Sequence, residues 1–192
     1  MSEAEFVAWC DSDTWAEWVD GEVLLMSPVN FEHADLHAHL LSLIRGFAED
    51  RELGKVVTEP FQIRFGELRR RRSPDIIFIS NRQRRQVKVA HFEGAPDLIV
   101  EIVSSESQSR DRRDKYLEYE AAGAKEYWIV DPLSRTVEVH VRGRTGKFRP
   151  APLKDEKIVS TVLKGFYLKP LWLWQEKLPK VSVLLREMNK AR

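Results

Sequence analysis

The chain has 192 residues, of which 43% are hydrophobic and 32% are charged, a composition that excludes a disordered chain and supplies the core of one compact domain. The 31 basic and 30 acidic residues give a formal net charge of +1, so any DNA-binding surface must come from local clusters of charge. The single cysteine, Cys10, excludes an internal disulfide and a cysteine-based zinc site, and the lack of a long apolar run or a signal peptide predicts a cytoplasmic protein with no membrane segment.

Two apolar segments near the N-terminus, residues 15–19 and 22–26, predict a β-hairpin. The Asp-Gly pair between them tolerates the positive φ angles of a tight hairpin turn. A long helix is predicted next, because apolar side chains recur at helical spacing over residues 31–50. The following glycine, Gly54, is well placed to end this segment.

Three strands are predicted in the middle of the chain. Residues 61–65 alternate apolar and polar side chains, which is typical of a strand with one face in the core. Residues 74–79 and 98–103 are nearly continuous apolar runs, which indicate strands buried on both faces. The charged run 67–72 is predicted as a turn, and residues 81–88 as an exposed basic connection.

The second half of the chain continues the alternation of helix and strand. Ser109 or Asp111 can cap a helix that ends near Ala122, and residues 126–130 form an apolar strand before an Asp-Pro pair. Shorter elements follow: strands over residues 136–141, 148–153 and 158–162, and a helix over 180–189.

This order of elements predicts a mixed α/β fold. No internal repeat, low-complexity tract or domain boundary is evident. We therefore expect a single domain over residues 1–192, with an N-terminal segment 1–13, a core 14–175 and a C-terminal helical tail 176–192.

One carboxylate, Glu101, falls in the middle of the apolar strand 98–103. A buried and unpaired carboxylate costs several kcal/mol, so a metal ion or a cation is expected opposite it. Two Pro-Asp pairs precede it, but Asp97 lies four residues away on the same strand, about 13 Å along it. Asp75 begins a neighbouring strand and can converge with Glu101 on one metal ion if the two strands pair in a suitable register. Mg²⁺ would require an oxygen of each carboxylate at about 2.1 Å from the ion.

A hydrolytic site of this kind also needs a cation to orient water and offset phosphate charge. The residue two positions after Glu101 is Val103, so the nearest candidate on a regular element is Lys115. On spacing alone, a surface ion pair between Lys115 and Asp111 is the favoured alternative.

Several segments together resemble the Uma-type bacterial restriction endonucleases, a branch of the PD-(D/E)XK nuclease superfamily. The resemblance covers roughly residues 15 to 175 and is specific in its combination of motifs. Its segments are Asp20-Gly21-Glu22, Met26-Ser27-Pro28, His33, Ser73-Pro74-Asp75-Ile76, residues 95–104 (APDLIVEIVS), Arg113-Asp114-Lys115-Tyr116 and residues 123–132 (GAKEYWIVDP). It implies a restriction-endonuclease-like core, with a central mixed β-sheet flanked by helices and an N-terminal β-hairpin.

The resemblance also implies a metal-dependent endonuclease that hydrolyses DNA phosphodiester bonds. Asp75 and Glu101 would hold Mg²⁺, or Mn²⁺ in its place, with the backbone carbonyl of Ile102 as a further ligand. Lys115 would take the lysine role, displaced from the superfamily's usual position at residue 103, and Glu22 would be an accessory acid.

Two arginine clusters border the strand that carries Asp75. Arg70, Arg71 and Arg72 precede it, and Arg84 and Arg85 follow it, so we expect these arginines either to grip DNA phosphates or to lie in solvated loops. A homodimer is expected, because two sites cut both strands of a duplex most easily.

Two other functions stay open at the sequence level. A catalytically inactive nuclease-fold domain could bind nucleic acid or a protein partner, since the lysine is displaced. A zinc protein could use His33 and His37, which lie one helical turn apart, although no third ligand is evident.

Overall fold

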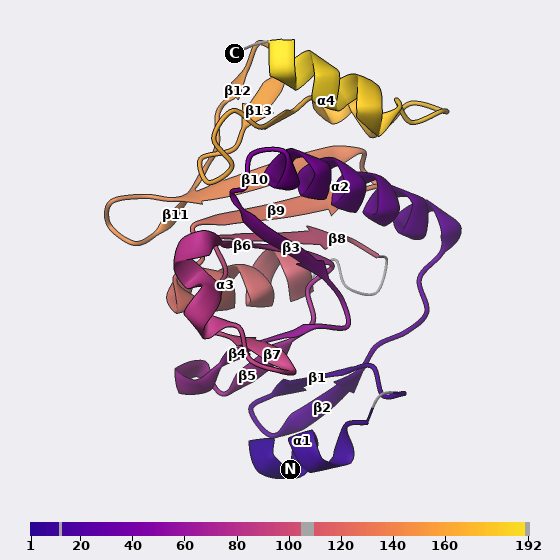
Figure 1. The fold of residues 1–192 in the computed structure, drawn as a ribbon. Coiled ribbons are helices and arrows are strands. Elements are labelled where there is room, and N and C mark those ends of the chain that lie inside the picture. Colours follow the sequence, from indigo (N-terminus) through magenta and orange to yellow (C-terminus); the bar gives the residue numbers. More distant parts are fainter. Residues whose placement is uncertain (12, 105–109, 191–192) are drawn as a thin grey trace.

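The computed structural model of the chain describes residues 1–11, 13–104 and 110–190 (Figure 1). Its helices are α1 (Glu3–Trp9), α2 (Phe31–Glu49), α3 (Tyr116–Ala122) and α4 (Val181–Lys190), with short helical turns η1 (Gly66–Leu68), η2 (Asn81–Gln86), η3 (Arg110–Lys115) and η4 (Pro170–Trp172). Its strands are β1 (Ala16–Val19), β2 (Glu22–Leu25), β3 (Gly54–Thr58), β4 (Gln62–Phe65), β5 (Arg70–Arg72), β6 (Ile76–Ser80), β7 (His91–Glu93), β8 (Leu98–Ile102), β9 (Glu126–Asp131), β10 (Thr136–Arg142), β11 (Phe148–Pro150), β12 (Leu153–Lys154), β13 (Lys157–Val159) and β14 (Tyr167–Leu168).

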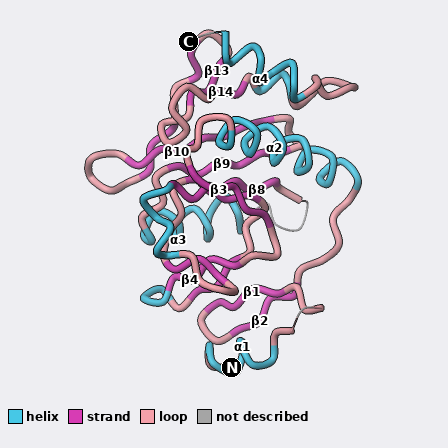
Figure 2. Tube along the Cα trace, viewed as in Figure 1, coloured by secondary structure: helices cyan, strands magenta, loops and turns pink. Residues whose placement is uncertain are grey.

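A six-stranded mixed sheet, in the order β11-β10-β9-β8-β6-β3, forms the centre of the molecule (Figure 2). Strand β8 runs parallel to β9 and antiparallel to β6. A five-stranded sheet, in the order β2-β1-β5-β4-β7, lies toward the N-terminal helix α1, while α4 lies at the opposite end of the molecule (Figure 1). The mixed α/β architecture predicted from the sequence is confirmed.

Alternate side chains of the central strands enter two different cores. Ile76, Val100 and Ile102 pack on the face covered by α2 and α4, whereas Ile77 and Ile99 pack on the face that meets α3 and the five-stranded sheet. Both faces are therefore dry, which explains the continuous apolar runs in the sequence. Residues 75 and 101 are an even number of positions from Ile77 and Ile99, so their side chains project from the same face of the sheet, toward α3.

Four strands, β3, β5, β7 and β14, were not expected from the sequence. The run predicted as a charged turn contains η1 and then β5, whose three arginines pair with β1 and β4. Strand β3 begins at Gly54, the residue expected to end the long helix; α2 instead ends at Glu49, with Asp50 as its C-cap. A Cβ atom on Gly54 would lie 2.1 Å from the carbonyl oxygen of Ile79, so the glycine is required where β3 crosses close to β6.

Within the described residues, none of the helices combines the length and the apolar composition needed to cross a bilayer.

Candidate active site

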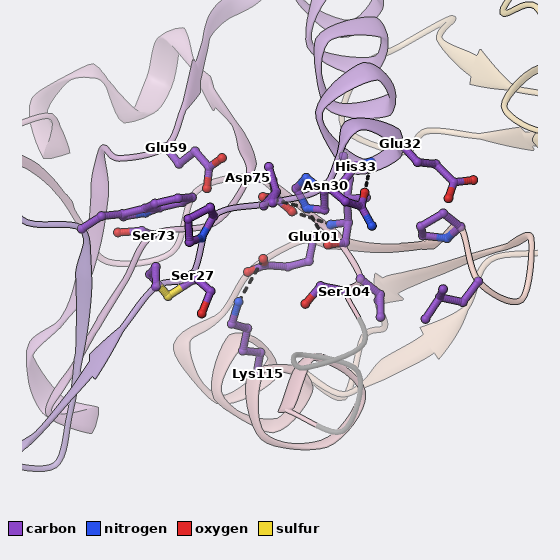
Figure 3. A pocket seen from close by; sticks show the side chains of 18 of the residues that line it. Ser27, Asn30, Glu32, His33, Glu59, Ser73, Asp75, Glu101, Ser104 and Lys115 are labelled. Atoms are coloured by element: carbon purple, nitrogen blue, oxygen red, sulfur yellow. Dashed lines mark hydrogen bonds and ion pairs between the residues drawn. The ribbon is translucent and has the colours of Figure 1, made fainter.

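A cavity of about 340 Å³ opens where the carboxyl ends of the parallel strands β8 and β9 meet the N-terminus of α2 (Figure 3). Such strand ends are the usual ligand position in α/β folds. Its lining comprises Trp15, Leu25, Met26, Ser27, Pro28, Val29, Asn30, Glu32, His33, Glu59, Ser73, Asp75, Glu101, Ile102, Val103, Ser104, Lys115, Pro132 and Leu133.

Strand pairing brings Asp75 and Glu101 together. The antiparallel register of β6 and β8 pairs Ile76 with Val100, so the next position in each direction puts Asp75 beside Glu101. The carboxylates are 6% and 4% exposed, and Asp75 Oδ2 accepts a hydrogen bond from the Ile102 amide at 2.5 Å. Asp97 lies at the other end of β8, where its carboxylate pairs with Lys125.

Lys115 reaches the same carboxylates from the last residue of η3. Its Nζ lies 3.0 Å from Glu101 Oε2 (Figure 3). The Tyr119 hydroxyl donates a hydrogen bond of 2.6 Å to Glu101 Oε1. Lys115 is only 2% exposed, so the alternative of a lysine on the surface is wrong. Segment η3 is a π-helix, a rare geometry that often occurs at functional sites.

Glu17 is a member of this cluster that the sequence reasoning missed. Its carboxylate is fully buried, accepts hydrogen bonds from Arg72 Nη1 at 2.7 Å and from the Ser73 amide at 3.1 Å, and lies 3.8 Å from Lys115 Nζ. Burial by itself raises the pKa of Glu17, but the charges of Lys115 and Arg72 outweigh it and lower that pKa. The signal was available, because Glu17 interrupts an apolar strand in the same way as Glu101 does.

The two histidines of α2 contact the Asp75 region separately. His33 Nε2 lies 2.9 Å from the Ile102 carbonyl oxygen and 3.6 Å from Asp75 Oδ1, whereas His37 Nε2 lies 3.0 Å from the Asp75 carbonyl oxygen and 2.8 Å from Thr58 Oγ1. Burial lowers the pKa of His33, but the hydrogen bond and charge of Asp75 outweigh it and raise that pKa.

A zinc site on His33 and His37 has no support in the structure. Across residues 1–11, 13–104 and 110–190, no group of three or more His, Cys, Asp or Glu side chains is arranged to hold a metal ion. Each imidazole contacts a different backbone carbonyl oxygen, His33 that of Ile102 and His37 that of Asp75.

The donor atoms in the cavity fit a hard divalent cation. The carboxylates of Asp75 and Glu101 line the same cavity as Ile102, and carboxylate and carbonyl oxygens suit Mg²⁺ or Mn²⁺. His33 Nε2 lies near two of these oxygens, 2.9 Å from the Ile102 carbonyl oxygen and 3.6 Å from Asp75 Oδ1. Since a carbonyl oxygen can only accept a hydrogen bond, Nε2 is the donor, and these oxygens already attract the positive end of an N–H group.

A fourth carboxylate, Glu59, lies on one side of the cavity, with Glu32 on the other side in the view of Figure 3. Burial, followed by the neighbouring charge of Asp75, raises the pKa of Glu59 to about 7. Near neutral pH this acid is therefore partly protonated, which limits its repulsion of Asp75.

Glu22 does not line the cavity. It is exposed at the turn end of β2, where it pairs with Val19, so the hairpin carries it away from the metal-binding oxygens. The hairpin residue that does approach them is Glu17, on the paired strand.

The arginines of the first cluster form ion pairs within the protein. Arg71 and Arg72 are 7% and 1% exposed, because β5 lies within the five-stranded sheet. Their guanidinium groups bind acidic side chains from α1, β1 and α3: Glu3, Glu17 and Glu118, the last of which also binds Arg70. These ion pairs leave the three arginines poorly placed to grip phosphates.

The arginines of the second cluster are exposed but lie far from Asp75. Arg84 and Arg85 lie in η2, which follows β6, whereas Asp75 precedes that strand. The five residues of β6 separate them from Asp75 by about 17 Å.

Comparison with known proteins now adds a family and a fold. The family model Uma2, described as "Putative restriction endonuclease", matches residues 3–170 of the chain. A crystal structure described as a putative nuclease belonging to DUF820, from Anabaena variabilis ATCC 29413, has 18% sequence identity and a TM-score of 0.75, over 91% of this chain and 97% of that chain. At this identity the likeness shows a shared fold. No curated protein matches the chain.

Proposed function

Because the chain belongs to the Uma2 family of restriction endonucleases, we propose that it is a metal-dependent endonuclease that hydrolyses phosphodiester bonds in DNA. Family membership and the fold support a nuclease. The observation that carries the finer proposal is the meeting of Asp75, Glu101 and Lys115 in one cavity.

Asp75 and Glu101 would hold Mg²⁺ or Mn²⁺ together with the Ile102 carbonyl. When bound, such an ion activates water and offsets the charge of the phosphate. The protein contributes the orientation of its own ligands: the Ile102 amide fixes the Asp75 carboxylate, and the Tyr119 hydroxyl fixes one oxygen of Glu101. Both carboxylates are therefore held in position before substrate arrives.

Lys115 provides the cation of the site. Its ammonium group donates to Glu101 and can also donate to a phosphate oxygen or to the attacking water in the cavity. Glu17 acts as a positioning residue, because its buried carboxylate attracts the same ammonium group from the opposite strand. The lysine is thus positioned by β1 and β8 although it is carried by η3.

The test compares cleavage of plasmid and oligonucleotide DNA, with Mg²⁺ or Mn²⁺, by the wild type and by Asp75→Asn and Asp97→Asn variants. We expect Asp75→Asn to lose cleavage and Asp97→Asn, at the other Pro-Asp pair, to retain it. Millimolar metal should also raise the melting temperature of the wild type, because bound metal relieves repulsion between the two carboxylates, and Asp75→Asn should lose this shift.

Equal cutting by wild type and Asp75→Asn would reveal a contaminating nuclease and contradict the proposal. Binding of DNA without cutting would favour a catalytically inactive nuclease-fold domain, a reading favoured by the place of Lys115 on η3 instead of at position 103.

A further inference from the structure

The two histidines of α2 contact the ends of three strands around the metal-binding oxygens. His33 Nε2 lies 2.9 Å from the carbonyl oxygen of Ile102, the last residue of β8. His37, one helical turn later, contacts the carbonyl oxygen of Asp75, just before β6, and the hydroxyl of Thr58, at the end of β3. The hydrolysis proposed above assigns no role to either imidazole, although both side chains reach the site.

His33 is placed by the first turn of α2. The helix begins at Phe31, and the side-chain oxygen of its N-cap, Asn30, accepts a hydrogen bond of 2.9 Å from the His33 amide. Further along the same helix, Leu36 and Leu40 pack into the core against the central sheet. The His33 side chain is 5% exposed and lines the cavity (Figure 3). Its position is therefore set by a capped and packed helix.

One ring nitrogen of His33 makes all of its hydrogen-bonding contacts. Nε2 is close to two oxygens, the Ile102 carbonyl oxygen at 2.9 Å and Asp75 Oδ1 at 3.6 Å. Nδ1 is buried, and it has no hydrogen-bond partner in the described part of the chain. Because a carbonyl oxygen only accepts hydrogen bonds, Nε2 carries a proton. The positive end of this N–H group therefore attracts two of the oxygens that would bind the metal.

The Asp75 carboxylate is held on its other oxygen by the backbone. Its Oδ2 accepts a hydrogen bond from the Ile102 amide at 2.5 Å. Residue 102 and His33 thus act on the two oxygens of one carboxylate, and His33 also acts on the carbonyl of residue 102. Groups that hydrogen-bond to metal ligands in this way orient them, and their loss typically weakens metal binding by roughly 10- to 100-fold.

We propose that His33 is a positioning residue for the metal, whose Nε2–H group holds the Ile102 carbonyl and the Asp75 carboxylate in the arrangement that binds Mg²⁺ or Mn²⁺. His37 supports the same segment through the Asp75 backbone. The inference rests on the proposed function for the presence of a metal at these oxygens. The histidine pair then acts on the metal through the oxygen ligands, without coordinating it.

The test measures Mn²⁺ binding to the metal-free protein by isothermal titration calorimetry, without DNA. We expect His33→Met, which has a similar length and no N–H group, to raise the Kd for Mn²⁺ by roughly 10- to 100-fold. His33→Gln carries an amide N–H as many bonds from the backbone as Nε2, so it should recover most of the affinity. The number of sites from the same titration reports the folded fraction, so partial unfolding lowers that number and leaves Kd unchanged.

Matched variants on the same helix separate positioning from packing. His39→Met changes a side chain that is 9% exposed, has no partner for its Nε2 in the described part of the chain and does not line the cavity. It should leave the Kd unchanged, whatever its effect on the melting temperature. His37→Met should weaken binding less than His33→Met, because His37 contacts no proposed metal ligand atom. If His33→Met does not fold, His33→Asn replaces it, since its N–H is one bond short of the Nε2 position.

Three results would overturn the inference. The first is an equal Kd for the wild type and His33→Met. The second is an equal loss of affinity in His33→Met and His33→Gln, because the N–H group would then have no part in the effect. The third is tighter Mn²⁺ binding by His33→Met, which would show that the N–H group competes with the metal for these oxygens.

The proposed function fails separately from this inference. Cleavage of DNA that requires Asp75, together with an unaltered Mn²⁺ Kd in His33→Met, keeps the nuclease and removes the role of His33. Mn²⁺ binding that depends on both Asp75 and His33, without any cleavage of DNA, supports the role of His33 and removes the nuclease.

Discussion

Lys115 carries a buried positive charge between two buried carboxylates. Its Nζ lies 3.0 Å from Glu101 and 3.8 Å from Glu17, and none of the three side chains is more than 5% exposed. Charges removed from water are stable only while each has its partners, so the three residues depend on one another. A lysine carried by a helical segment can therefore be held as firmly as one on the strand itself.

Loss of this lysine should destabilise the fold. We expect Lys115→Met to lower the free energy of unfolding by about 3–5 kcal/mol, because two buried carboxylates lose their shared cation. The double variant Glu101→Gln/Lys115→Met should recover part of that loss. Urea denaturation checks both, with Arg45→Met as the control, since the exposed Arg45–Glu49 pair is worth about 1 kcal/mol or less. Equal losses for Lys115→Met and Arg45→Met would contradict the expectation.

Two close approaches between elements fix the central sheet around the site. Strand β3 pairs with β6 over its full length, and Gly54 is the point where β3 meets the Ile79 carbonyl. Strand β6 in turn pairs with β8, so a shift of β6 along β8 would separate Asp75 from Glu101. The geometry of the site is thus a property of strand register.

A substitution at Gly54 tests the close approach between β3 and β6. We expect Gly54→Ala to lower the free energy of unfolding by about 1–3 kcal/mol, because the added methyl group overlaps the Ile79 carbonyl and forces β3 away from β6. Gly143→Ala serves as the comparison, since its nearest neighbour, the Lys147 carbonyl, would lie at 3.3 Å. Guanidinium denaturation of the two variants should rank Gly54→Ala as the less stable; the reverse order would argue against the close approach.

The elements that could be predicted from the sequence are those with a local signal. The apolar runs of β8 and β9 and the helical period of α2 follow from burial of their own side chains. Strand β5 could not be predicted, because its arginines are neutralised by glutamates far away in the sequence. In the candidate site, the pairing of Asp75 with Glu101 follows from strand spacing, whereas Glu17 and the buried position of Lys115 depend on contacts between distant segments.

At the scale of the whole molecule, the substrate bears on the number of subunits required. A homodimer remains a prediction for an enzyme that cuts both strands of a duplex.

Acidic side chains spread over the molecule link its stability to pH. Hydrogen bonding to Arg64 lowers the pKa of Glu3, and hydrogen bonding to the Phe148 amide lowers that of Glu120. In each case the native carboxyl group releases its proton at a lower pH than the unfolded chain does. The unfolded state therefore binds more protons in acid, and stability decreases as the pH falls.

The dependence of stability on pH can be tested at one residue, Asp131. Burial raises its pKa, but hydrogen bonds from Ser134 and the charge of Arg112 outweigh burial and lower the pKa to about 2. The stabilisation is complete above the unfolded pKa of about 3.9 and is lost as the pH falls toward 2. Urea denaturation between about pH 6 and pH 2.5 should show a smaller decline for Asp131→Asn than for the wild type; parallel declines would contradict the assignment.

The buried cluster draws its members from positions 17, 75, 101 and 115, which lie on β1, just before β6, on β8 and on η3. Contacts between residues so far apart in the chain form late, after the loops between them have closed. No segment of the chain that ends before residue 115 contains the two carboxylates and the lysine together, so the cluster cannot assemble until at least that much of the chain is in place. For a nuclease, this arrangement ties the onset of activity to the folding of a segment that spans at least residues 17–115.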